Sequence, residues 1–335
     1  MYYYCSSRLL AINLSKLTEM TRLTIKDIAR LSGVGKSTVS RVLNQDPKVS
    51  DKTRAKVEKI IAEQGFLPSN SARAMRGQGN RVIGIIVSRL TSSAENQVLS
   101  AMLPLLYATH CEPIIVESRF DEKLVQDHLT LFRQKAVDGV ILFSFSSIEQ
   151  LDLSSWKQKL VVIARNHPGL TSIYYDDHSA VQQLMQTLLQ KSHQAIAYIG
   201  VDDNDTTTGF LRHHAYLSFC RQHQLPMLAL QGDLNFESGY QLAQQIDFSQ
   251  YSALVCATNN LALGAIKYLQ QQQLTHIYVA SVGNNPLLSF LFPQTLMIDL
   301  GFQQAGEKAV SQLLYLLDGG QEIKSICLPC HLLEN

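Results

Sequence analysis

The chain has 335 residues, 46% of them hydrophobic, and a formal net charge of +1 at pH 7. That length allows two or three domains with a substantial core. No apolar run approaches the ~18 residues of a membrane-spanning helix, and the start lacks the charged segment and cleavage site of a secretory signal. We therefore expect a cytoplasmic protein without a membrane contact, whose six cysteines are reduced.

The near-neutral total hides an uneven distribution of charge. Residues 20–81 carry 13 Lys and Arg against 5 Asp and Glu, a net charge of +8, whereas the residues after 81 carry −8 and residues 1–19 carry +1. A basic module favours a polyanionic partner such as double-stranded DNA. Residues 1–19 match neither part. We expect them to be a disordered extension, or the product of a start codon assigned too early, without a function.

The first predicted elements are three short helices in residues 20–66. Thr24 and Asp27 have the spacing of a capping box at the start of the first helix, and Gly33 supplies the left-handed residue that ends it. A second helix is predicted over about 36–44 and a third over about 51–64. A tight Gly-Val turn between the first two is typical of a helix-turn-helix module. The residues predicted to pack the helices together are Ile28, Ala29, Leu31, Val39, Val42, Leu43, Ala55, Val57, Ile60 and Ile61.

The second helix exposes side chains that suit DNA. Lys36, Ser37 and Arg41 can reach base edges or phosphates. The alternative is a three-helix bundle without this role, and the strong positive charge of the module argues against it.

Residues 67–80 are predicted to form a hinge. Pro68 sets an extended entry. The segment 69–76 is too short to be a stable lone helix, so we expect it to fold only when paired with its twin against DNA. The alternative is a plain linker.

Residues 23–44 and 66–76 resemble the headpiece and hinge of the LacI/GalR family of transcription regulators, in the family's order and spacing. The resemblance implies that the second helix reads bases and that Met75 stands where the family places an apolar wedge for the minor groove. We also expect a homodimer, because one helix-turn-helix module reads one half-site and two are needed for useful specificity. The residues predicted to contact DNA are Thr24, Lys36, Ser37, Thr38, Arg41, Asn44, Asn70, Arg73, Met75 and Arg76.

From residue 81 to 335 apolar strands alternate with amphipathic helices. This pattern predicts an α/β core of two doubly wound, parallel-sheet lobes with a ligand between them, and it resembles the periplasmic-binding-protein-like core of the same family. The predicted strands are 82–87, 113–117, 139–143, 160–164, 173–175, 195–200, 253–257, 278–282 and 296–298. The predicted helices are 95–107, 123–135, 179–191, 211–223, 238–246, 260–272 and 303–317.

Residues that directly follow strands should line the cleft between the lobes. Arg89 and Arg165 do so, the polar run 205–209 leads into a helix that carries Arg212, and Asn259 and Asn260 follow a later strand. Three converging arginines and a helix N-terminus suggest a phosphorylated, hydroxyl-rich ligand. The alternative is that one or two of these arginines form structural ion pairs, for example with Glu95 or Asp177.

Four core segments resemble the trehalose-responsive repressors of the family in particular: Ser88–Leu90, Thr207–Gly209, Leu261–Gly264 and Ala280–Asn284. The resemblance implies that the effector is trehalose 6-phosphate and that it releases the protein from its operator. Phe302 stands where that group has an aromatic hydroxyl, and Asn259 stands where many family members have Asp. The alternatives are a repressor that responds to a different sugar phosphate or disaccharide, and a sugar-binding transport or sensor protein. The residues predicted to bind the effector are Arg89, Glu95, Arg165, Thr207, Thr208, Arg212, Asn259, Asn260 and Phe302.

We expect no enzyme, cofactor or metal site, because no acid–base pair or ligand cluster stands out. His213 and His214 are neighbours on a helix and are expected to point in different directions. Cys327 and Cys330 lack a second pair at zinc spacing and are expected to be plain thiols.

Overall fold

The computed structural model describes residues 23–43, 46–64, 80–146, 148 and 151–333. The chain divides into two units between Gly79 and Asn80, and each is described by itself. None of the described helices is long and apolar enough to cross a membrane.

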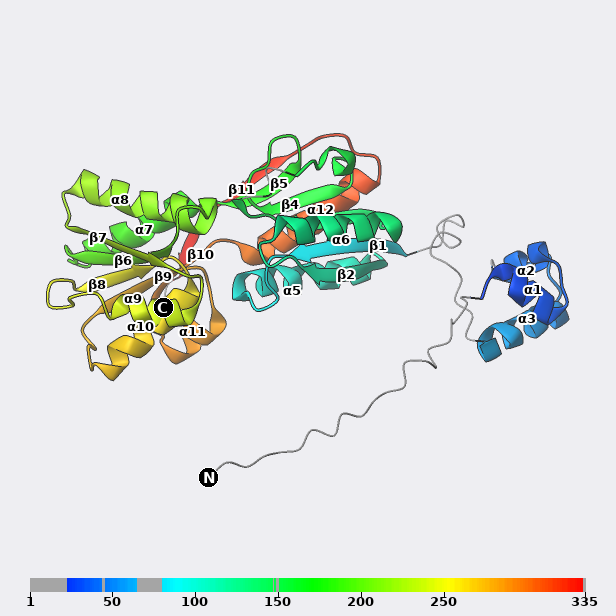
Figure 1. The fold of residues 1–335 in the computed structure, drawn as a ribbon, viewed down its shortest axis with the longest axis horizontal. Coiled ribbons are helices and arrows are strands. Elements are labelled where there is room, and N and C mark those ends of the chain that lie inside the picture. Colours follow the sequence, from blue (N-terminus) through cyan, green and yellow to red (C-terminus); the bar gives the residue numbers. More distant parts are fainter. Residues whose placement is uncertain (1–22, 44–45, 65–79, 147, 149–150, 334–335) are drawn as a thin grey trace, which may run out of the picture. The chain divides into compact units, whose positions relative to one another are not determined.

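The first unit contains three helices, α1 (Ile25–Ser32), α2 (Lys36–Leu43) and α3 (Asp51–Gln64) (Figure 1). The predicted capping box is confirmed: the Thr24 hydroxyl accepts from the backbone N–H of Asp27, and the Asp27 carboxylate accepts from the Thr24 N–H. Gly33 ends α1 at φ 63°, the left-handed conformation that glycine adopts at no steric cost.

The small core between these helices differs from the prediction at two positions. Its buried residues are Ile28, Ala29, Val39, Val42, Val49 and Val57. Leu31 is 44% exposed, and Ser32 takes the inward position instead, with its hydroxyl bonded to the Ile28 carbonyl at 2.5 Å. Ala55 is also exposed, because it lies two residues from Val57 and so on the opposite side of α3.

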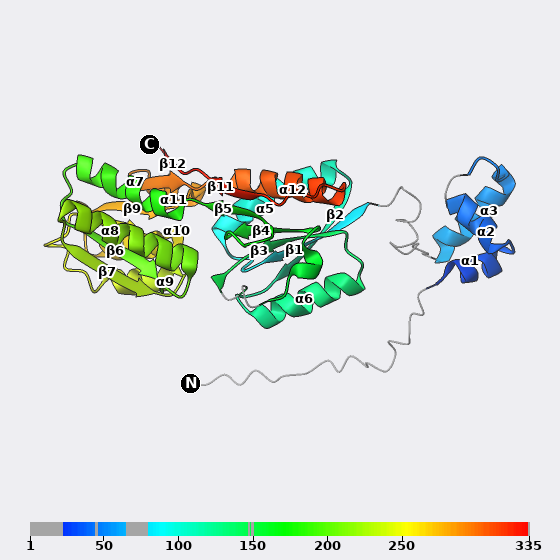
Figure 2. The same cartoon turned by 90° about the horizontal axis from the view of Figure 1, so that it is seen from above.

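The second unit is a two-lobed α/β core, as the sequence predicts. The first lobe is a six-stranded parallel sheet in the order β11-β5-β4-β3-β1-β2. In Figure 2, α5 and α12 lie on one side of this sheet and α6 on the other. The elements of this lobe are β1 (Arg81–Val87), α5 (Ser93–Ala108), β2 (Cys111–Glu117), α6 (Glu122–Gln134), β3 (Gly139–Phe143), a 3-10 turn (Ser154–Trp156), β4 (Leu160–Ala164), β5 (Thr171–Tyr175), α12 (Phe302–Leu317) and β11 (Ser325–Leu328).

Gly84 in β1, which lies between β3 and β2, allows α6 to lie close to the sheet. A Cβ atom on Gly84 would be 2.3 Å from a ring carbon of Phe132, which is fully buried. The ring therefore occupies the space that a side chain would need, and the apolar β1–α6 layer is fixed by this contact.

The second lobe is a six-stranded sheet in the order β12-β10-β9-β8-β6-β7, parallel except for the edge strand β12. Helices α7 and α8 cover one face, and α9 and α10 cover the other (Figure 1). Its elements are α7 (Asp177–Gln190), β6 (Ile196–Val201), a π-helix η4 (Thr206–Leu211), α8 (Arg212–His223), β7 (Met227–Gly232), α9 (Phe236–Ala243), β8 (Ala253–Cys256), α10 (Asn259–Gln271), β9 (Tyr278–Val282), α11 (Pro286–Leu291), β10 (Leu296–Asp299) and β12 (His331–Leu333).

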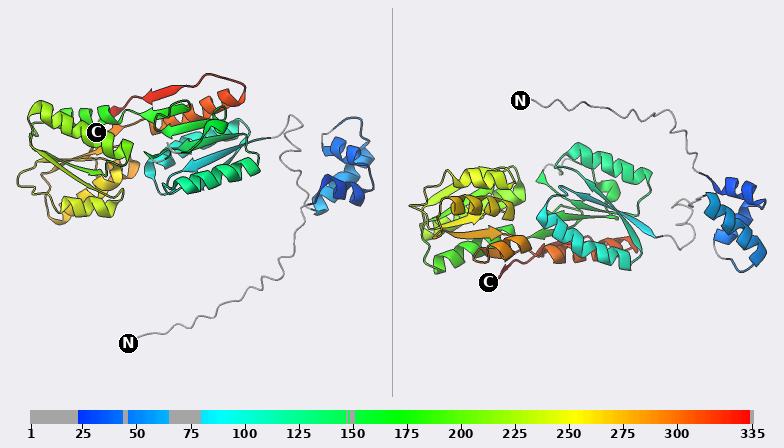
Figure 3. Two further views of the ribbon diagram at one scale, coloured as in Figure 1. Left: turned by 45° about the horizontal axis from the view of Figure 1, so that its top comes forward. Right: turned by 90° about the horizontal axis from the view of Figure 1, so that it is seen from below.

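The chain passes between the two lobes three times: from β5 to α7, from β10 to α12, and from β11 to β12. Figure 3 shows the last passage as the red C-terminal segment that runs along both lobes. The pocket between the lobes is lined by residues that follow the strands, so it lies at the C-terminal ends of the parallel strands.

Candidate functional site

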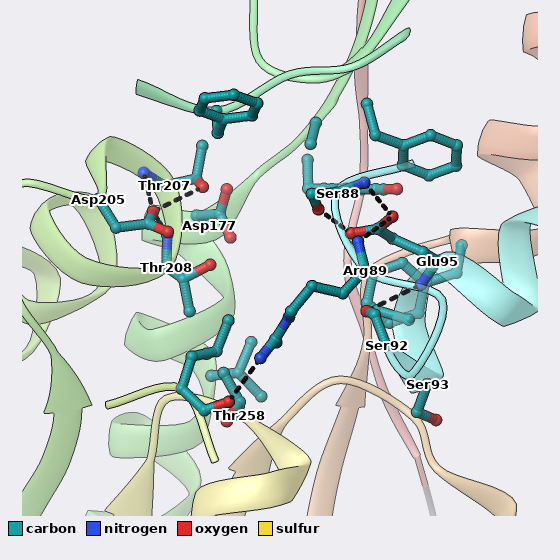
Figure 4. A pocket seen from close by; sticks show the side chains of 18 of the residues that line it. Ser88, Arg89, Ser92, Ser93, Glu95, Asp177, Asp205, Thr207, Thr208 and Thr258 are labelled. Carbon is teal, nitrogen blue, oxygen red and sulfur yellow. Dashed lines mark hydrogen bonds between the residues drawn. The ribbon is translucent and has the colours of Figure 1, made fainter. Parts of the chain in front are cut away.

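A pocket between the lobes collects the residues that follow the strands (Figure 4). Its empty volume is about 980 Å³, which includes space open to solvent. Eight of the nine predicted effector-binding residues line it: Arg89, Glu95, Thr207, Thr208, Arg212, Asn259, Asn260 and Phe302.

Arg89 extends from the first lobe across the pocket (Figure 4) and donates from Nη1 to the Leu234 carbonyl in the second lobe, at 3.0 Å. Its Nε is buried without a hydrogen-bond partner among the described residues. A buried, unpaired N–H of a cation is costly. Arg89 therefore holds a buried donor at the pocket wall whose hydrogen bond is unmade among the described residues.

Glu95 lies behind Arg89 at the start of α5. Its carboxylate accepts the backbone N–H of Ser88 at 2.8 Å and the Ser88 hydroxyl. Burial raises the pKa of Glu95, and the hydrogen bonds from Ser88 act in the opposite direction. Glu95 holds the turn that aims Arg89, and it adds an acceptor to the pocket wall.

The N-terminal end of the π-helix η4 is capped by its own chain. The Asp205 carboxylate accepts the backbone N–H groups of Thr207 at 3.0 Å and Thr208 at 2.9 Å, as well as the Thr207 hydroxyl. These N–H groups, which the sequence suggested as an anion cradle, are thus already bound to a carboxylate. What this segment offers the pocket is side chains, above all the Thr208 hydroxyl shown in Figure 4.

Arg212 forms a structural ion pair, one of the alternatives that the sequence left open. Its guanidinium contacts the Asp177 carboxylate at 2.7 Å and donates to the Ala257 carbonyl. The side chains of Arg212 and Asp177 are only 8% and 1% exposed. Burial acts to raise the pKa of Asp177, and the adjacent Arg212 charge lowers it. The positive charge of Arg212 is therefore largely balanced within the protein.

Aromatic side chains form the apolar walls of the pocket. Phe302 packs edge-on against Tyr175, with ring centroids 5.2 Å apart, and Phe120 packs edge-on against Phe145 at 5.7 Å. The Arg89 guanidinium lies 5.3 Å from the Phe120 ring centre. Such rings suit the apolar faces of a sugar and hold the arginine in place.

Asn259 begins α10 and is 7% exposed. Its side-chain oxygen accepts from the Ser281 hydroxyl at 2.9 Å, and its amide nitrogen would be 2.9 Å from a Cβ atom on Gly283. Ser281 and Gly283 therefore fix the orientation of this amide at the pocket wall, next to Asn260.

Arg165 does not line the pocket. Its Nη1 donates to the carbonyls of Phe145 at 3.1 Å and Ser146 at 2.9 Å, and the Ser146 hydroxyl contacts Thr206 across the lobes at 3.1 Å. Of the three arginines predicted at the cleft, Arg89 and Arg212 are among the described residues that line this pocket, together with the acidic Glu95, Asp177 and Asp205. The position of Arg165 directly after β4 predicted that it lies near the cleft. Its guanidinium is instead held by the backbone carbonyls of Phe145 and Ser146.

The sequence reasoning overlooked several lining residues. Ser144 and Phe145 directly follow β3, so the rule that found Arg89 could have found them. Phe120 follows β2 in the left-handed conformation, with φ 60°. No sequence signal marks that turn, since a left-handed phenylalanine is uncommon.

The helix α2 in the first unit presents the predicted DNA-contacting side chains. Lys36, Ser37 and Arg41 are exposed, whereas Thr38 is half-buried. Arg41 lies 3.9 Å from the Asp46 carboxylate and keeps 59% of its side chain exposed. Thr24 is exposed but acts as the cap of α1. Asn44, Asn70, Arg73, Met75 and Arg76 lie outside the described residues.

His213 and His214 contradict the prediction that they point in different directions. The Asp203 carboxylate lies 2.9 Å from Nδ1 of His213 and 3.7 Å from Nε2 of His214. One imidazole uses its near nitrogen and the other its far nitrogen, so adjacent residues reach the same carboxylate. Cys327 and Cys330 are free thiols, and burial raises the pKa of Cys330 to about 11.

Comparisons with known proteins agree with both units. Residues 24–69 match the family of bacterial regulatory proteins of the LacI type, and residues 185–334 match the periplasmic binding protein-like domain. The chain is 48% identical to the HTH-type transcriptional regulator TreR of Salmonella typhimurium, over 92% of this chain and 98% of that protein. It is 47% identical to TreR of Escherichia coli, over 93% and 99%.

The solved structures give the same result. The trehalose repressor from Escherichia coli aligns with a TM-score of 0.74 and 41% identity, over 76% of this chain and all of that one. A lac repressor structure aligns with a TM-score of 0.77 over 93% of this chain, and its 23% identity supports the fold alone. Since relatives almost half identical match along nearly their whole length, the chain belongs to the LacI family of bacterial regulatory proteins, and it is a helix-turn-helix transcription regulator rather than an enzyme.

Proposed function

We propose that this protein is a cytoplasmic repressor of trehalose uptake and utilisation genes, which binds operator DNA as a homodimer and is released when trehalose 6-phosphate enters the pocket between the lobes. The observation that carries the choice of ligand is Arg89, whose buried Nε lacks a partner among the described residues. The names of its 41–48% identical relatives support trehalose as the sugar.

The division of charge in the pocket supports a ligand with one anionic end and many hydroxyls. Arg89 supplies a fixed cation with a free donor, which suits a phosphate. Glu95 lies next to Arg89, whereas Asp205 and the Asn259 amide line the pocket from the second lobe. Carboxylates and amides accept hydrogen bonds from sugar hydroxyls, and the four aromatic rings cover sugar faces.

The phosphate contact is tested by Arg89→Ala in the full chain. Trehalose 6-phosphate and free trehalose are titrated into each variant by calorimetry. Losing charge-assisted hydrogen bonds of about 1.5–3 kcal/mol weakens binding of the phosphosugar ~10–150-fold. Free trehalose should lose only the ~2–10-fold that follows from breaking the inter-lobe bond to Leu234. Arg119→Ala is the matched control, because Arg119 is exposed and pairs with Glu117. An equal loss for both sugars would contradict the assignment of Arg89 to the phosphate.

Control of DNA binding is tested with a labelled duplex of operator length. The wild type should bind it in a salt-sensitive manner and release it when trehalose 6-phosphate is added. Arg41→Ala should weaken binding, and Arg30→Ala on the neighbouring helix α1 serves as its control. The proposal would be contradicted if Arg41→Ala binds the duplex as tightly as the wild type and no phosphosugar releases the duplex. A response to glucose 6-phosphate or another disaccharide alone would point to the other effector classes.

The proposed homodimer is tested by measuring the mass of the protein in solution. A helix-turn-helix module reads one half-site, so two modules give useful specificity. Sedimentation of the free protein should give twice the chain mass of 37.4 kDa, and a monomer at micromolar concentration would contradict this part.

A further inference from the structure

A second polar cluster lies in the second lobe, outside the effector pocket. It is formed by Asp203, in the loop after β6, and by His213 and His214, in the first turn of α8. Each residue offers one ligand atom, and these atoms all lie within 4.8 Å of one another.

The distances from the Asp203 carboxylate to the two imidazoles are close to the edge of a coordination polyhedron. In a tetrahedral zinc site with bonds of about 2.0–2.1 Å, the ligand atoms lie roughly 3.3 Å apart. Asp203 Oδ1 and Oδ2 lie 2.9 and 3.2 Å from Nδ1 of His213, and Oδ2 lies 3.7 Å from Nε2 of His214. The last distance is too long for a hydrogen bond, so a hydrogen bond from His213 alone does not explain why His214 faces the same carboxylate.

Aromatic neighbours hold both imidazole rings in place. His213 stacks on Tyr198, with ring centroids 5.9 Å apart, and His214 packs against Phe210 at 4.0 Å. The His213 side chain is 15% exposed, whereas that of His214 is 47% exposed. One ligand is therefore anchored in the lobe, and the other lies at the surface, where a metal ion can enter.

Gln231 in β7 completes the surroundings. Its amide nitrogen lies 2.7 Å from Oδ1 of Asp203 and 3.0 Å from Nδ1 of His213. A half-turn of the amide would place its oxygen toward the same point, since the two ends are assigned only from the hydrogen-bond network. Either this oxygen or a water can fill a fourth position.

We propose that Asp203, His213 and His214 bind a divalent transition-metal ion, with Zn²⁺ as the best match. Two imidazole nitrogens and one carboxylate oxygen are borderline ligands that suit zinc and leave a fourth position open. The metal ion would join the loop after β6 to the start of α8. The π-helix that carries Thr207 and Thr208 lies between these two points, so the ion would brace one wall of the effector pocket.

The test is metal binding by the full chain, purified without an affinity tag and stripped with a chelator. Equilibrium dialysis against Zn²⁺ should give one ion per chain at micromolar concentration, and a rise in Tm. His214→Gln and Asp203→Asn should each weaken binding at least ~10-fold, because even losing a residue that only hydrogen-bonds to a metal ligand costs about 10–100-fold. His223→Gln is the matched control, because His223 also packs against an aromatic ring, Phe219, on the same helix.

Co²⁺ provides a second readout that separates this cluster from the thiols. Co²⁺ in the proposed site should show tetrahedral d–d absorption without thiolate charge-transfer bands, and the d–d absorption should disappear in His214→Gln. The proposal is overturned if no Zn²⁺ binds at micromolar concentration, if both variants bind as tightly as the wild type, or if the Co²⁺ spectrum shows thiolate ligands.

Discussion

At the scale of single residues, Arg212 illustrates how a pocket residue can support the fold at the same time. Its guanidinium and the Asp177 carboxylate are 2.7 Å apart and almost fully buried. Removing one partner of such a pair leaves a buried charge without compensation, which costs about 3–5 kcal/mol. Arg212→Ala should therefore lower the free energy of unfolding by that amount, as measured by urea denaturation.

Two further variants separate this effect from loss of a ligand contact. Replacing both partners, as in Arg212→Leu with Asp177→Leu, should restore most of the stability, since an apolar pair avoids the desolvation cost. Arg81→Ala breaks the exposed pair with Asp318 and should cost at most about 1 kcal/mol. If Arg212→Ala is as stable as Arg81→Ala, the ion pair is not structural.

Glu95 should make the stability of the protein depend on pH. Burial raises its pKa above the ordinary value of 4.5, so the folded state keeps this proton to higher pH than the unfolded chain does. The contribution of Glu95, measured as the Tm of the wild type minus that of Glu95→Gln, should fall as pH rises above 4.5.

Glu117 provides a control with the opposite sign. Hydrogen bonds from Arg119 and the Leu90 backbone lower the pKa of Glu117. The difference between the wild type and Glu117→Gln should therefore rise as pH increases through the ordinary range of a glutamate. If the two Tm differences change with pH in the same direction, burial does not set the pKa of Glu95.

At the scale of elements, Thr24 at the start of α1 has two candidate roles, capping the helix and contacting DNA. The sequence predicts both a DNA contact and a cap, and the structure has the cap, with the Thr24 hydroxyl accepting from the backbone N–H of Asp27 at 3.4 Å. Thr24→Ala should destabilise the helix by about 0.5–2 kcal/mol, while Thr24→Ser should preserve it. Hydrogen exchange of peptides covering residues 24–33 measures this directly. Equal protection in both variants would mean that the cap contributes nothing.

How far the sequence predicts each element depends on its length and burial. The long buried strands and amphipathic helices of the core were predicted, because their periodicity is strong. The half-exposed edge strand β7, the six-residue helix α11 and the three-residue strand β12 were not. Such elements are stabilised by neighbours far away in the chain, and no local pattern marks them.

The same limit applies to the pocket. The rule that ligands bind beyond the C-terminal ends of parallel strands predicted its location. The partners of its charged groups were not predictable. Arg212 and Asp177 are 35 residues apart in sequence, and the Asp205 carboxylate competes for the very N–H groups that looked open to a ligand.

At the scale of the whole core, hydrogen bonds between the lobes can tune the response to a ligand. Gln97 of α5 donates to the Asn284 carbonyl at 2.7 Å, and Asn285 donates to the Ser93 hydroxyl at 3.0 Å. Both bonds join the first lobe to the segment after β9. A bond of this kind contributes about 0.5–1.5 kcal/mol, which changes an equilibrium between closed and open lobes by ~2–10-fold.

Gln97→Ala should therefore weaken binding of trehalose 6-phosphate by about the same factor of ~2–10, because a ligand held by both lobes favours the closed arrangement. Calorimetry measures the affinity, and small-angle scattering of the ligand-free protein should show a larger radius of gyration. Gln245→Ala is the matched control, since Gln245 bonds to Gln241 within its own helix region. If Gln97→Ala changes neither affinity nor radius, the bonds at this edge of the cleft do not hold the lobes together, and the closing of the cleft depends on Arg89 and the ligand itself.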